Sequence, residues 1–574
     1  MKIVLTLAMM VLLLPALLLS QQLPQKPVFD ADIPSGSVVT WQADTVYVLQ
    51  EFVFVDTLAE LHIEEGTVIK AKDGQGANAA ALIVARGGKI FAEGTAEHPI
   101  IFTTKYDDVT DPNDMLPEDR GLWGGVILLG RSTNNVPGGV GQIEGIPELE
   151  LRGRYGGDNE NDNSGIMRYV SIRHGGTDIG AGNEINGLTF GSVGSGTTID
   201  FIEVYNNNDD GYEWFGGTVN TKHLVSAFNR DDAFDYDQGF RGKHQFWFVL
   251  QDSTNGIGNR GGEHDGGTSS AITAQPYSMP LISNATFIGS GANSNNADND
   301  RALYFRENAG GFYMNSIFTD FKGICVKLGD VETFNMMQAN NLKLSSNLWW
   351  NFGGGNTWND LISVSGADKL VFIDSLVINN NQLADPQINS IPADRRTVNG
   401  LDPRPNSSGV AASGYTTLSD PFFTPANYAG AFNPNAPLWI KGWTWISQAG
   451  YTGIKESALQ NSVIPAQYVL AQNYPNPFNP ETTIQYSVPQ KGIVTLTVFN
   501  VLGEKVITLV NGNRAVGTYQ VKWNASSLPS GGWCFGMRHH PFQFVEILFM
   551  EALRFYLASS VNIRAMHQPG FYGF

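Results

Sequence analysis

The chain is poor in cysteine and in positive charge. Its 574 residues include only two cysteines, Cys325 and Cys534, so a disulfide framework is excluded as the main source of stability. Cys325 is expected to be a small apolar packing residue. The 36 Lys and Arg residues are outnumbered by 55 Asp and Glu residues. The resulting net charge of −19 argues against nucleic acid and against anionic membrane surfaces as partners.

Long hydrophobic runs are also scarce. The one long run follows Met1-Lys2 and covers residues 3–19, which is typical of a signal peptide over residues 1–20. Because this run is close to the length that spans a bilayer, an uncleaved anchor is the alternative. No other stretch is long and apolar enough to cross a membrane, so the mature chain is expected to contain no transmembrane segment.

Helical periodicity is nearly absent, whereas turn-forming residues are abundant. The 64 glycines, together with many Asn and Asp residues, predict a β-rich protein with many tight turns. Residues 208–215 (NDDGYEWF) match residues 230–237 (RDDAFDYD) position by position, 22 residues apart. Short strands repeating at this period predict an all-β protein whose main domain is a right-handed parallel β-helix, a solenoid.

Alternation within the repeat predicts which side chains enter the solenoid. Tyr212, Trp214 and their counterparts 22 residues later are expected to stack inside. Glu213 and Asp235 then point outward. The core of the domain is therefore expected to be a column of aromatic rings.

At 574 residues the chain is too long for one ordinary core. We expect the β-helix over residues 21–400, and a cap with a linker over residues 401–467, where the repeat is lost. The aromatic segment 438–445 is expected to close the open end of the solenoid, which otherwise exposes strand edges. Three tryptophans in it have a sugar-stacking platform as their alternative role: Trp439, Trp443 and Trp445. Insertions rich in Gly, Asn and Asp are expected as loops on one flank, at 105–120, 130–165 and 251–275.

A second domain follows the linker. Residues 474–480 (YPNPFNP) carry three prolines and cannot be helical. With NVLGEKV (500–506), LPSG (528–531) and the alternating strands between them, they predict a small antiparallel β-sandwich over residues 468–531. This stretch resembles the type A C-terminal sorting domain of the type IX secretion system of Bacteroidota-like bacteria. The resemblance implies that the type IX secretion machinery is a partner, and that the protein is secreted or held at the outer-membrane surface.

The larger domain shows a resemblance as well. Residues 60–350 resemble a group of exported β-helix proteins that carry the same sorting domain. The segments that carry this resemblance include WGGVILLG (123–130), DDGYEWFGGTVN (209–220) and RGKHQFWFVLQ (241–251). The group has no established activity, so the resemblance implies a fold and a destination only.

The character of the sequence changes after Gly531. Residues 532–574 show no clear pattern of strands separated by turns, and the apolar run 544–557 has helical rather than strand composition. We expect this tail to be anomalous, the product of a frameshift or gene-model error. The sandwich would then lack its closing strands.

Acidic residues recur at the 22-residue period. Successive coils of a β-helix lie ~4.8 Å apart, and like charges at that separation repel by roughly 3 kcal/mol at an effective dielectric of 20. A bound divalent cation offsets this repulsion, and Ca²⁺ suits carboxylate and carbonyl oxygens on turns. The alternative is that each Asp caps a turn by accepting a hydrogen bond from a backbone N–H. The predicted metal ligands are Asp209, Asp210, Glu213, Asp231, Asp232, Asp235 and Asp237.

Basic residues near these carboxylates are the candidate catalytic groups. Arg241, Lys243 and His244 lie in one segment, and His264 lies in the next. Parallel β-helix polysaccharide lyases combine Ca²⁺ with an Arg or Lys that abstracts a proton beside a uronate carboxylate. A fold does not determine a function, however, and an ordinary solvated surface is the alternative for each residue. The chain has no G-x-S-x-G elbow, no P-loop and no H-E-x-x-H motif.

These observations favour a non-catalytic surface or adhesive protein that binds Ca²⁺ or glycan. No complete catalytic set can be assembled from the sequence. The alternative is a secreted polysaccharide lyase that uses the acidic Ca²⁺ site with an Arg, Lys or His base. In either case a polysaccharide or a cell-surface glycan is the expected partner.

Overall fold

The structure of the protein is a computed structural model with two compact units. Unit 1 contains the residues up to 389, with 393–395 and 403–448; unit 2 contains 390–392, 396–402 and the residues from 449 on. The predicted signal peptide, residues 1–20, lies outside the described residues. The described residues are 23–180, 183–267, 271–452, 457–459, 468–471, 473, 481–489, 491–500, 502, 504–514, 517–525, 531–540 and 544–552.

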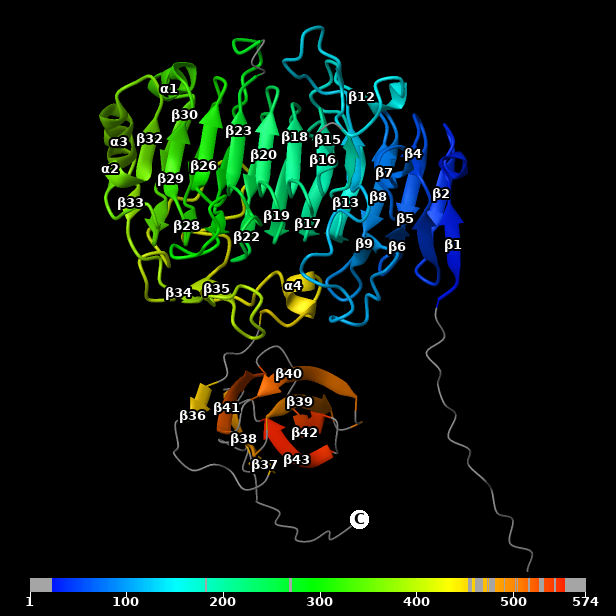
Figure 1. Ribbon diagram of the computed structural model, residues 1–574, viewed down its shortest axis with the longest axis vertical. Helices are drawn as coiled ribbons and strands as arrows, with labels where there is room; N and C mark the ends of the chain where they lie inside the picture. Colours follow the sequence, from blue (N-terminus) through cyan, green and yellow to red (C-terminus); the bar gives the residue numbers. More distant parts are fainter. Residues whose placement is uncertain are drawn as a thin grey trace, which may run out of the picture. The chain divides into compact units, whose positions relative to one another are not determined.

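Unit 1 is a parallel β-helix, in which each coil adds one strand to each of three faces (Figure 1). The first face contains β2 (Val38–Trp41), β5 (Glu60–Ile63), β8 (Lys89–Glu93), β21 (Lys243–Gln245), β24 (Leu281–Ser283), β27 (Gly311–Met314) and β30 (Leu342–Ser345). The second face contains β1 (Gln25–Val28), β3 (Val46–Leu49), β6 (Val68–Ala71), β9 (Ile100–Thr104), β22 (Phe248–Leu250), β25 (Thr286–Ile288), β28 (Ile317–Thr319), β31 (Leu348–Trp350) and β33 (Gln382–Leu383). Three longer strands run through both faces: β13 (Gly165–Arg173), β17 (Thr198–Tyr205) and β19 (Asn220–Ala227).

The third face is a separate ten-stranded parallel sheet. Its strands are β4 (Phe52–Val55), β7 (Ala81–Val84), β10 (Val126–Leu129), β16 (Leu188–Gly191), β18 (Tyr212–Phe215), β20 (Phe234–Asp237), β23 (Gly262–Asp265), β26 (Arg301–Arg306), β29 (Ile324–Leu328) and β32 (Ile362–Val364). Short elements decorate the coils: η1 (Asp30–Asp32), η2 (Gly76–Asn78), η3 (Leu151–Gly153), β11 (Gly141–Gln142), β12 (Arg154–Tyr155), β14 (Asp178–Gly180) and β15 (Asn183–Glu184). The predicted parallel β-helix is confirmed.

The 22-residue repeat of the sequence is the register between β18 and β20. Tyr212 pairs with Phe234, and Trp214 pairs with Tyr236. All four side chains are buried in the same core. The Trp214 and Phe234 rings both stack on Trp247, with centroids 5.3 Å and 4.1 Å away. The predicted column of aromatic rings is present.

A second aromatic stack lies on the outside, where the first face bends into the second. Tyr169, Phe201, His223 and Phe246 occupy this bend in four successive coils, with φ between 49° and 63°. Neighbouring ring centroids are 4.4, 4.0 and 4.9 Å apart. Bulky residues rarely adopt positive φ, and stacking between coils offsets part of that cost. We call these four residues the bend stack.

Helices close the C-terminal end of the β-helix. They are α1 (Val331–Gln338), α2 (Trp358–Leu361) and α3 (Lys369–Ile378). Helix α3 begins where the Asp368 carboxylate accepts a hydrogen bond from the N–H of Leu370. Its Phe372 and Leu376 side chains are buried in the solenoid core. The prediction that residues 438–445 close this end is therefore wrong, because the apolar face of α3 already does so.

Residues 403–448, which we call the strap, run along the side of the coils. Trp443 packs edge-on against Phe201 of the bend stack, with ring centroids 6.2 Å apart. The strap ends in α4 (Trp445–Gln448), whose first two N–H groups donate to the buried carboxylate of Glu203, at 2.6 Å and 3.3 Å. The aromatic residues of the strap thus cover lateral strands, since the outward stack of the bend offers them apolar surface. The short strand β34 (Ile388–Ser390) precedes the strap, and β35 (Asp402–Pro405) overlaps its first residues.

The insertions lie at two edges of the solenoid. Residues 105–120 connect β9 to β10, between the second and third faces. Residues 130–164 connect β10 to β13, between the third and first faces. The expectation of a single flank is wrong, because either turn can lengthen without disturbing the strand ladders.

Unit 2 is a sandwich of two four-stranded sheets, as predicted. One sheet contains β36 (Ser457–Leu459), β41 (Gly517–Asn524), β38 (Glu481–Val488) and β37 (Val469–Leu470). The other contains β40 (Lys505–Arg514), β39 (Gly492–Asn500), β42 (Gly531–His540) and β43 (Phe544–Ala552). All the pairings described between these strands are antiparallel.

The expectation that the sandwich lacks its closing strands is wrong. Strand β42 pairs with β39, and β43 pairs with β42. Trp533, Phe535 and Met537 alternate along β42 and are buried in the core of the sandwich. Residues 544–552 form a strand despite their helical composition, because the edge of β42 supplies backbone partners. The frameshift hypothesis concerns the gene and stays a prediction; residues 553–574 lie outside the described part.

The structure also bears on membrane-spanning helices and on the two cysteines. Within the described ranges, no helix combines the length and the apolar character needed to span a bilayer. Both cysteines are free, and Cys325 is buried in the solenoid core, as expected of a packing residue.

Candidate metal centre

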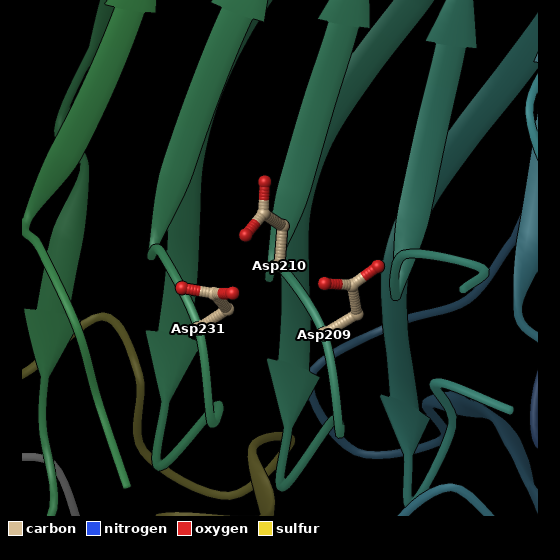
Figure 2. Close-up of side chains that lie close together, drawn as sticks. All are labelled: Asp209, Asp210 and Asp231. Carbon is tan, nitrogen blue, oxygen red and sulfur yellow. The ribbon is translucent and has the colours of Figure 1, made fainter. Parts of the chain in front are cut away.

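The predicted acidic residues come together on the outside of the third face. Asp209 and Asp210 immediately precede the turn into β18, and Asp231 holds the same place before β20 (Figure 2). Glu213 and Asp235 lie side by side in these two strands, because the strand register pairs them. Asp232 lies two residues before β20, and Asp237 is the last residue of that strand. We call the whole set the carboxylate ladder.

The ladder is larger than the sequence predicted. Four further carboxylates belong to it: Glu144, Glu184, Glu263 and Asp265. Strand β23 places Glu263 beside Asp235, 28 residues earlier rather than 22. Glu144 arrives on the insertion 130–164, and the Asn186 side-chain amide donates to both Glu144, at 2.8 Å, and Glu213. Loops from different parts of the sequence therefore converge on one row of strands.

Three overlapping groups of ladder carboxylates have ligand oxygens within 4.8 Å of one another. They are Asp209, Asp210 and Asp231; Asp210, Glu213 and Asp235; and Asp232, Asp235 and Glu263. Asp235 belongs to two groups, and its Oδ1 is buried without a hydrogen-bond partner. Ca²⁺ takes about six to eight oxygen ligands at roughly 2.3–2.6 Å, so oxygens on opposite sides of the ion fit this separation. The donor set is therefore that of a hard divalent cation.

Burial makes these carboxyl groups difficult to ionise. Burial, reinforced by neighbouring carboxylates, raises the pKa to about 8 at three positions: Asp209, Asp232 and Asp237. The same two causes raise the pKa of Asp210, Glu213 and Asp235 well above its ordinary range. A cation among them would reverse this effect, since it favours the charged form.

Arginines neutralise one half of the ladder. The Arg260 guanidinium lies 3.1 Å from Asp232 and 3.0 Å from Glu263. The Arg306 guanidinium lies 3.2 Å from Glu263 and 2.7 Å from Asp265. These ion pairs supply the third carboxylate group with positive charge from the protein itself.

The other half has no such compensation. Among the described residues, neither Asp209, Asp210 and Asp231 nor Glu213 and Asp235 form an ion pair. The first two carboxylate groups thus have the weaker compensation by positive charge of the protein itself.

Turn capping also takes place, in a form that differs from the expected one. Asp210 Oδ1 accepts a hydrogen bond from the backbone N–H of Asp232, at 2.9 Å. Asp232 Oδ1 accepts one from the backbone N–H of Arg260, at 2.6 Å. Each bond joins one coil to the next rather than closing the turn that precedes its own strand. Capping occupies one oxygen at two positions, and so it is compatible with cation binding.

The prediction of a catalytic role is wrong for two of the four candidate residues, His244 and His264. His264 points into the solenoid, where its ring stacks on Tyr236 at 4.0 Å and its Nε2 lies 2.8 Å from the Tyr313 hydroxyl. His244 is also inside, 2.8 Å from Thr221 Oγ1. Burial lowers the pKa of His264 to about 3 and that of His244 well below its usual range. Both rings are neutral core residues, sealed from any substrate.

The other two candidates are engaged elsewhere. The Arg241 guanidinium pairs with Glu160, at 3.0 Å. The Lys243 ammonium pairs with Asp420 of the strap, at 2.5 Å, from the outside of the first face. The structure therefore does not join either residue to the carboxylate ladder, which lies on the third face.

The strap tryptophans do not form a platform for a sugar ring. Trp443 and Trp445 are 0% and 4% exposed. One side of the Trp439 ring stacks on Phe432, with centroids 5.3 Å apart, and Trp443 lies 6.5 Å away at a similar inclination. The platform is wrong because the bend stack and the strap itself cover the indole faces.

Sequence reasoning missed the extra ladder residues for two different reasons. Glu263 and Asp265 carry a signal, since EHD (263–265) repeats the pattern of DYD (235–237). The coil between them is six residues longer than the repeat, and this concealed the match. Glu144 carries no signal, because an irregular insertion brings it to the ladder.

Comparison with known families agrees with this architecture. Residues 33–356 match the model of a pectate-lyase-like beta helix domain. Residues 472–540 match a secretion system C-terminal sorting domain. No curated protein and no solved structure matches the chain.

Proposed function

The chain belongs to the pectate-lyase-like beta helix family and carries a type IX sorting domain that directs it to the cell surface or to secretion, and from these premises we propose that it is a non-catalytic, Ca²⁺-binding surface protein. The carboxylate ladder would hold the cations. The expected partner is a cell-surface or extracellular glycan, held by a cation whose remaining ligand positions face outward. Binding of this kind suits an adhesive role.

The observation that carries the proposal is the unequal compensation of the ladder. Asp209, Asp210 and Asp231 bring oxygens within 4.8 Å of one another without an arginine between them. At an effective dielectric of 20, one pair of unit charges at this separation repels by about 3 kcal/mol. A folded protein is stable by only ~5–15 kcal/mol, so several such pairs favour either protonation or a bound cation.

Two features favour a binding protein over a lyase. A β-elimination needs a base that gives and takes a proton, and the cations beside the ladder are Arg260 and Arg306. Although burial lowers it, the paired carboxylates raise the pKa of both guanidinium groups above the ordinary value. Neither arginine is therefore suited to accept a proton at neutral pH. The two histidines proposed as alternative bases, His244 and His264, are sealed in the core.

The lyase remains the second candidate, because the matched family is described as pectate-lyase-like. A glycan screen that follows the absorbance of unsaturated products, with and without Ca²⁺, separates the two. A Ca²⁺-dependent rise in absorbance on any uronate polymer would replace the binding proposal with the lyase.

Calorimetry tests the cation directly. Full-length protein is treated with chelator, dialysed and titrated with Ca²⁺, with Mg²⁺ as the comparison because it requires a tighter octahedral site. We expect saturable Ca²⁺ binding that weakens in the Asp210→Asn variant. Absence of both Ca²⁺ binding and a Ca²⁺-dependent rise in melting temperature would refute the proposal.

A further inference from the structure

We propose that a groove on the first face of the β-helix binds an amphipathic anion, a molecule with an acyl-like apolar body and one anionic head group. This site is separate from the carboxylate ladder, which lies on the third face, and the proposal does not depend on Ca²⁺. The head group would pair with Lys343. The apolar body would lie on Leu281, Phe312 and Met314.

The groove follows from the strand register of four coils. Lys243, Leu281, Phe312 and Lys343 are aligned in successive strands, β21, β24, β27 and β30. Their neighbours in sequence, such as Ile282 and Tyr313, point into the core, so these four side chains point outward. Three strand spacings separate the two lysines, which corresponds to roughly 14 Å along the solenoid axis.

The groove has the size and the lining of a ligand site. Its volume is about 430 Å³, within the range of roughly 300–1,000 Å³ that small-molecule sites occupy. The lining residues are Arg241, Gly242, Lys243, Met279, Leu281, Phe312, Met314 and Lys343. Its floor is apolar and its charges, all positive, stand at the two ends.

Charge complementarity determines the kind of ligand. The protein carries a net charge of −19, yet every charged residue that lines this groove is basic. Two of these basic residues, Arg241 and Lys243, are paired with carboxylates, so the positive charge that an approaching anion finds here is that of Lys343. An apolar floor offers few hydrogen-bonding groups to a sugar, and so it favours an acyl chain or a similar hydrophobic body over a glycan.

The same charges determine the orientation of the ligand. At one end, Lys243 is paired with Asp420 and Arg241 is paired with Glu160. At the other end, Lys343 forms no ion pair or hydrogen bond with any residue in the described part of the chain. The head group is therefore expected at the Lys343 end, with the apolar body extending over Phe312 toward Lys243.

The test is isothermal titration of the full-length protein with sodium decanoate below its micellar concentration. Decyltrimethylammonium and a neutral decyl glucoside serve as probes of the same apolar length. We expect saturable binding of decanoate, weaker binding of the glucoside and the weakest binding of the cation. Equal affinity for all three probes, or no binding of decanoate, would overturn the proposal.

Variants locate the binding. Phe312→Ser removes apolar contact and should weaken decanoate binding by about tenfold or more. Lys343→Gln should weaken it by about two- to fivefold, the value of one exposed ion pair, and should abolish the preference over the cation. Lys89→Gln, on the same face but in a distant coil, is the matched control and should change nothing.

The remaining outcomes also decide the question. If Phe312→Ser does not fold, Lys343→Gln and the probe series still distinguish the groove from other apolar surface. Unchanged affinity in Lys343→Gln would overturn the assignment of the head group. An acidic oligosaccharide that competes as well as decanoate does would overturn the choice of ligand.

Discussion

Replacing Asp235 by Asn tests the carboxylate ladder most sharply, because the sign of its effect should depend on the cation. Asp235 is shared by two of the three carboxylate groups, and its Oδ1 is buried without a hydrogen-bond partner. Without a cation, the substitution removes repulsion from Asp210 and Glu213. With a cation, it removes a ligand.

The magnitude follows from the geometry. One carboxylate pair at 4.8 Å contributes about 3 kcal/mol of repulsion at an effective dielectric of 20. Partial protonation reduces this, so we expect Asp235→Asn to stabilise the chelator-treated protein by about 1–3 kcal/mol. For a solenoid of about 360 residues, 1 kcal/mol corresponds to roughly 1 °C in melting temperature.

The wild type should respond to Ca²⁺ in the opposite sense. At a Ca²⁺ concentration of 100 times Kd, binding stabilises the folded state by about 2.7 kcal/mol, or roughly 3–4 °C by the same scaling. Asp235→Asn should lose most of this gain. The variant is therefore more stable than the wild type in chelator, and equally or less stable in excess Ca²⁺.

The assay is thermal unfolding of full-length protein by calorimetry, in chelator and in Ca²⁺, with Asp374→Asn on the exposed side of α3 as the control. The control should shift neither melting temperature. If Asp235→Asn destabilises the protein equally in both conditions, the ladder is satisfied without a cation and the electrostatic reasoning fails.

Three further predictions concern other parts of the molecule. The pKa of Asp209 is raised to about 8 in the folded state, so the folded, chelator-treated protein holds a proton that the unfolded chain releases near pH 4. Its stability should therefore fall as the pH rises from about 4 through about 8, and Ca²⁺ should reduce this dependence. Melting curves from pH 4.5 to 8.5 measure the effect, and a stability that rises with pH would contradict it. Glu203→Ala removes one of the two acidic neighbours of the buried Arg173, the other being Asp107, and removes the acceptor of the first two N–H groups of α4. It should cost about 1–3 kcal/mol for each N–H group left without a partner and expose the strap 403–448 to limited proteolysis; an unchanged digestion pattern would show that the strap does not depend on this carboxylate. A stop codon after Gly531 removes β42 and should abolish the cooperative unfolding of the sandwich and type IX export, whereas a stop after residue 552 should preserve both; export of the shorter chain would contradict the strand assignment.

Much of the fold could be read from the sequence, and one reason is specific to solenoids. When coils stack in register, a 22-residue repeat is itself a list of contacts, so Tyr212 over Phe234 and Glu213 over Asp235 could be predicted without coordinates. The parity of the strand then assigned the inner and outer side chains. Where a coil is longer, that inference fails, and so His264 is a candidate catalytic residue by sequence although its register with Tyr236 puts it in the core.

The predictions for the tail and for the strap were wrong for a related reason. Phe544 to Ala552 has helical composition, but a neighbouring strand edge determines its conformation. Segment 438–445 is rich in aromatic residues that can pack on any apolar surface, so its composition does not determine whether it covers the end or the side of the solenoid. The bend stack that receives it is built from residues such as Tyr169 and Phe201, which no local pattern marks as outward stacking partners.

The sequence by itself therefore determined the parallel coils, the aromatic interior, the sorting domain and the acidic row, since each of these depends on periodicity or on a contiguous motif. Only the tertiary structure decided which carboxylates have an arginine beside them. Arg260 and Arg306 neutralise one end of the carboxylate ladder, and Glu144 adds a carboxyl group to the other end from a distant insertion. Electrostatic energy depends on distances between side chains, and distances across insertions of irregular length are set by folding alone.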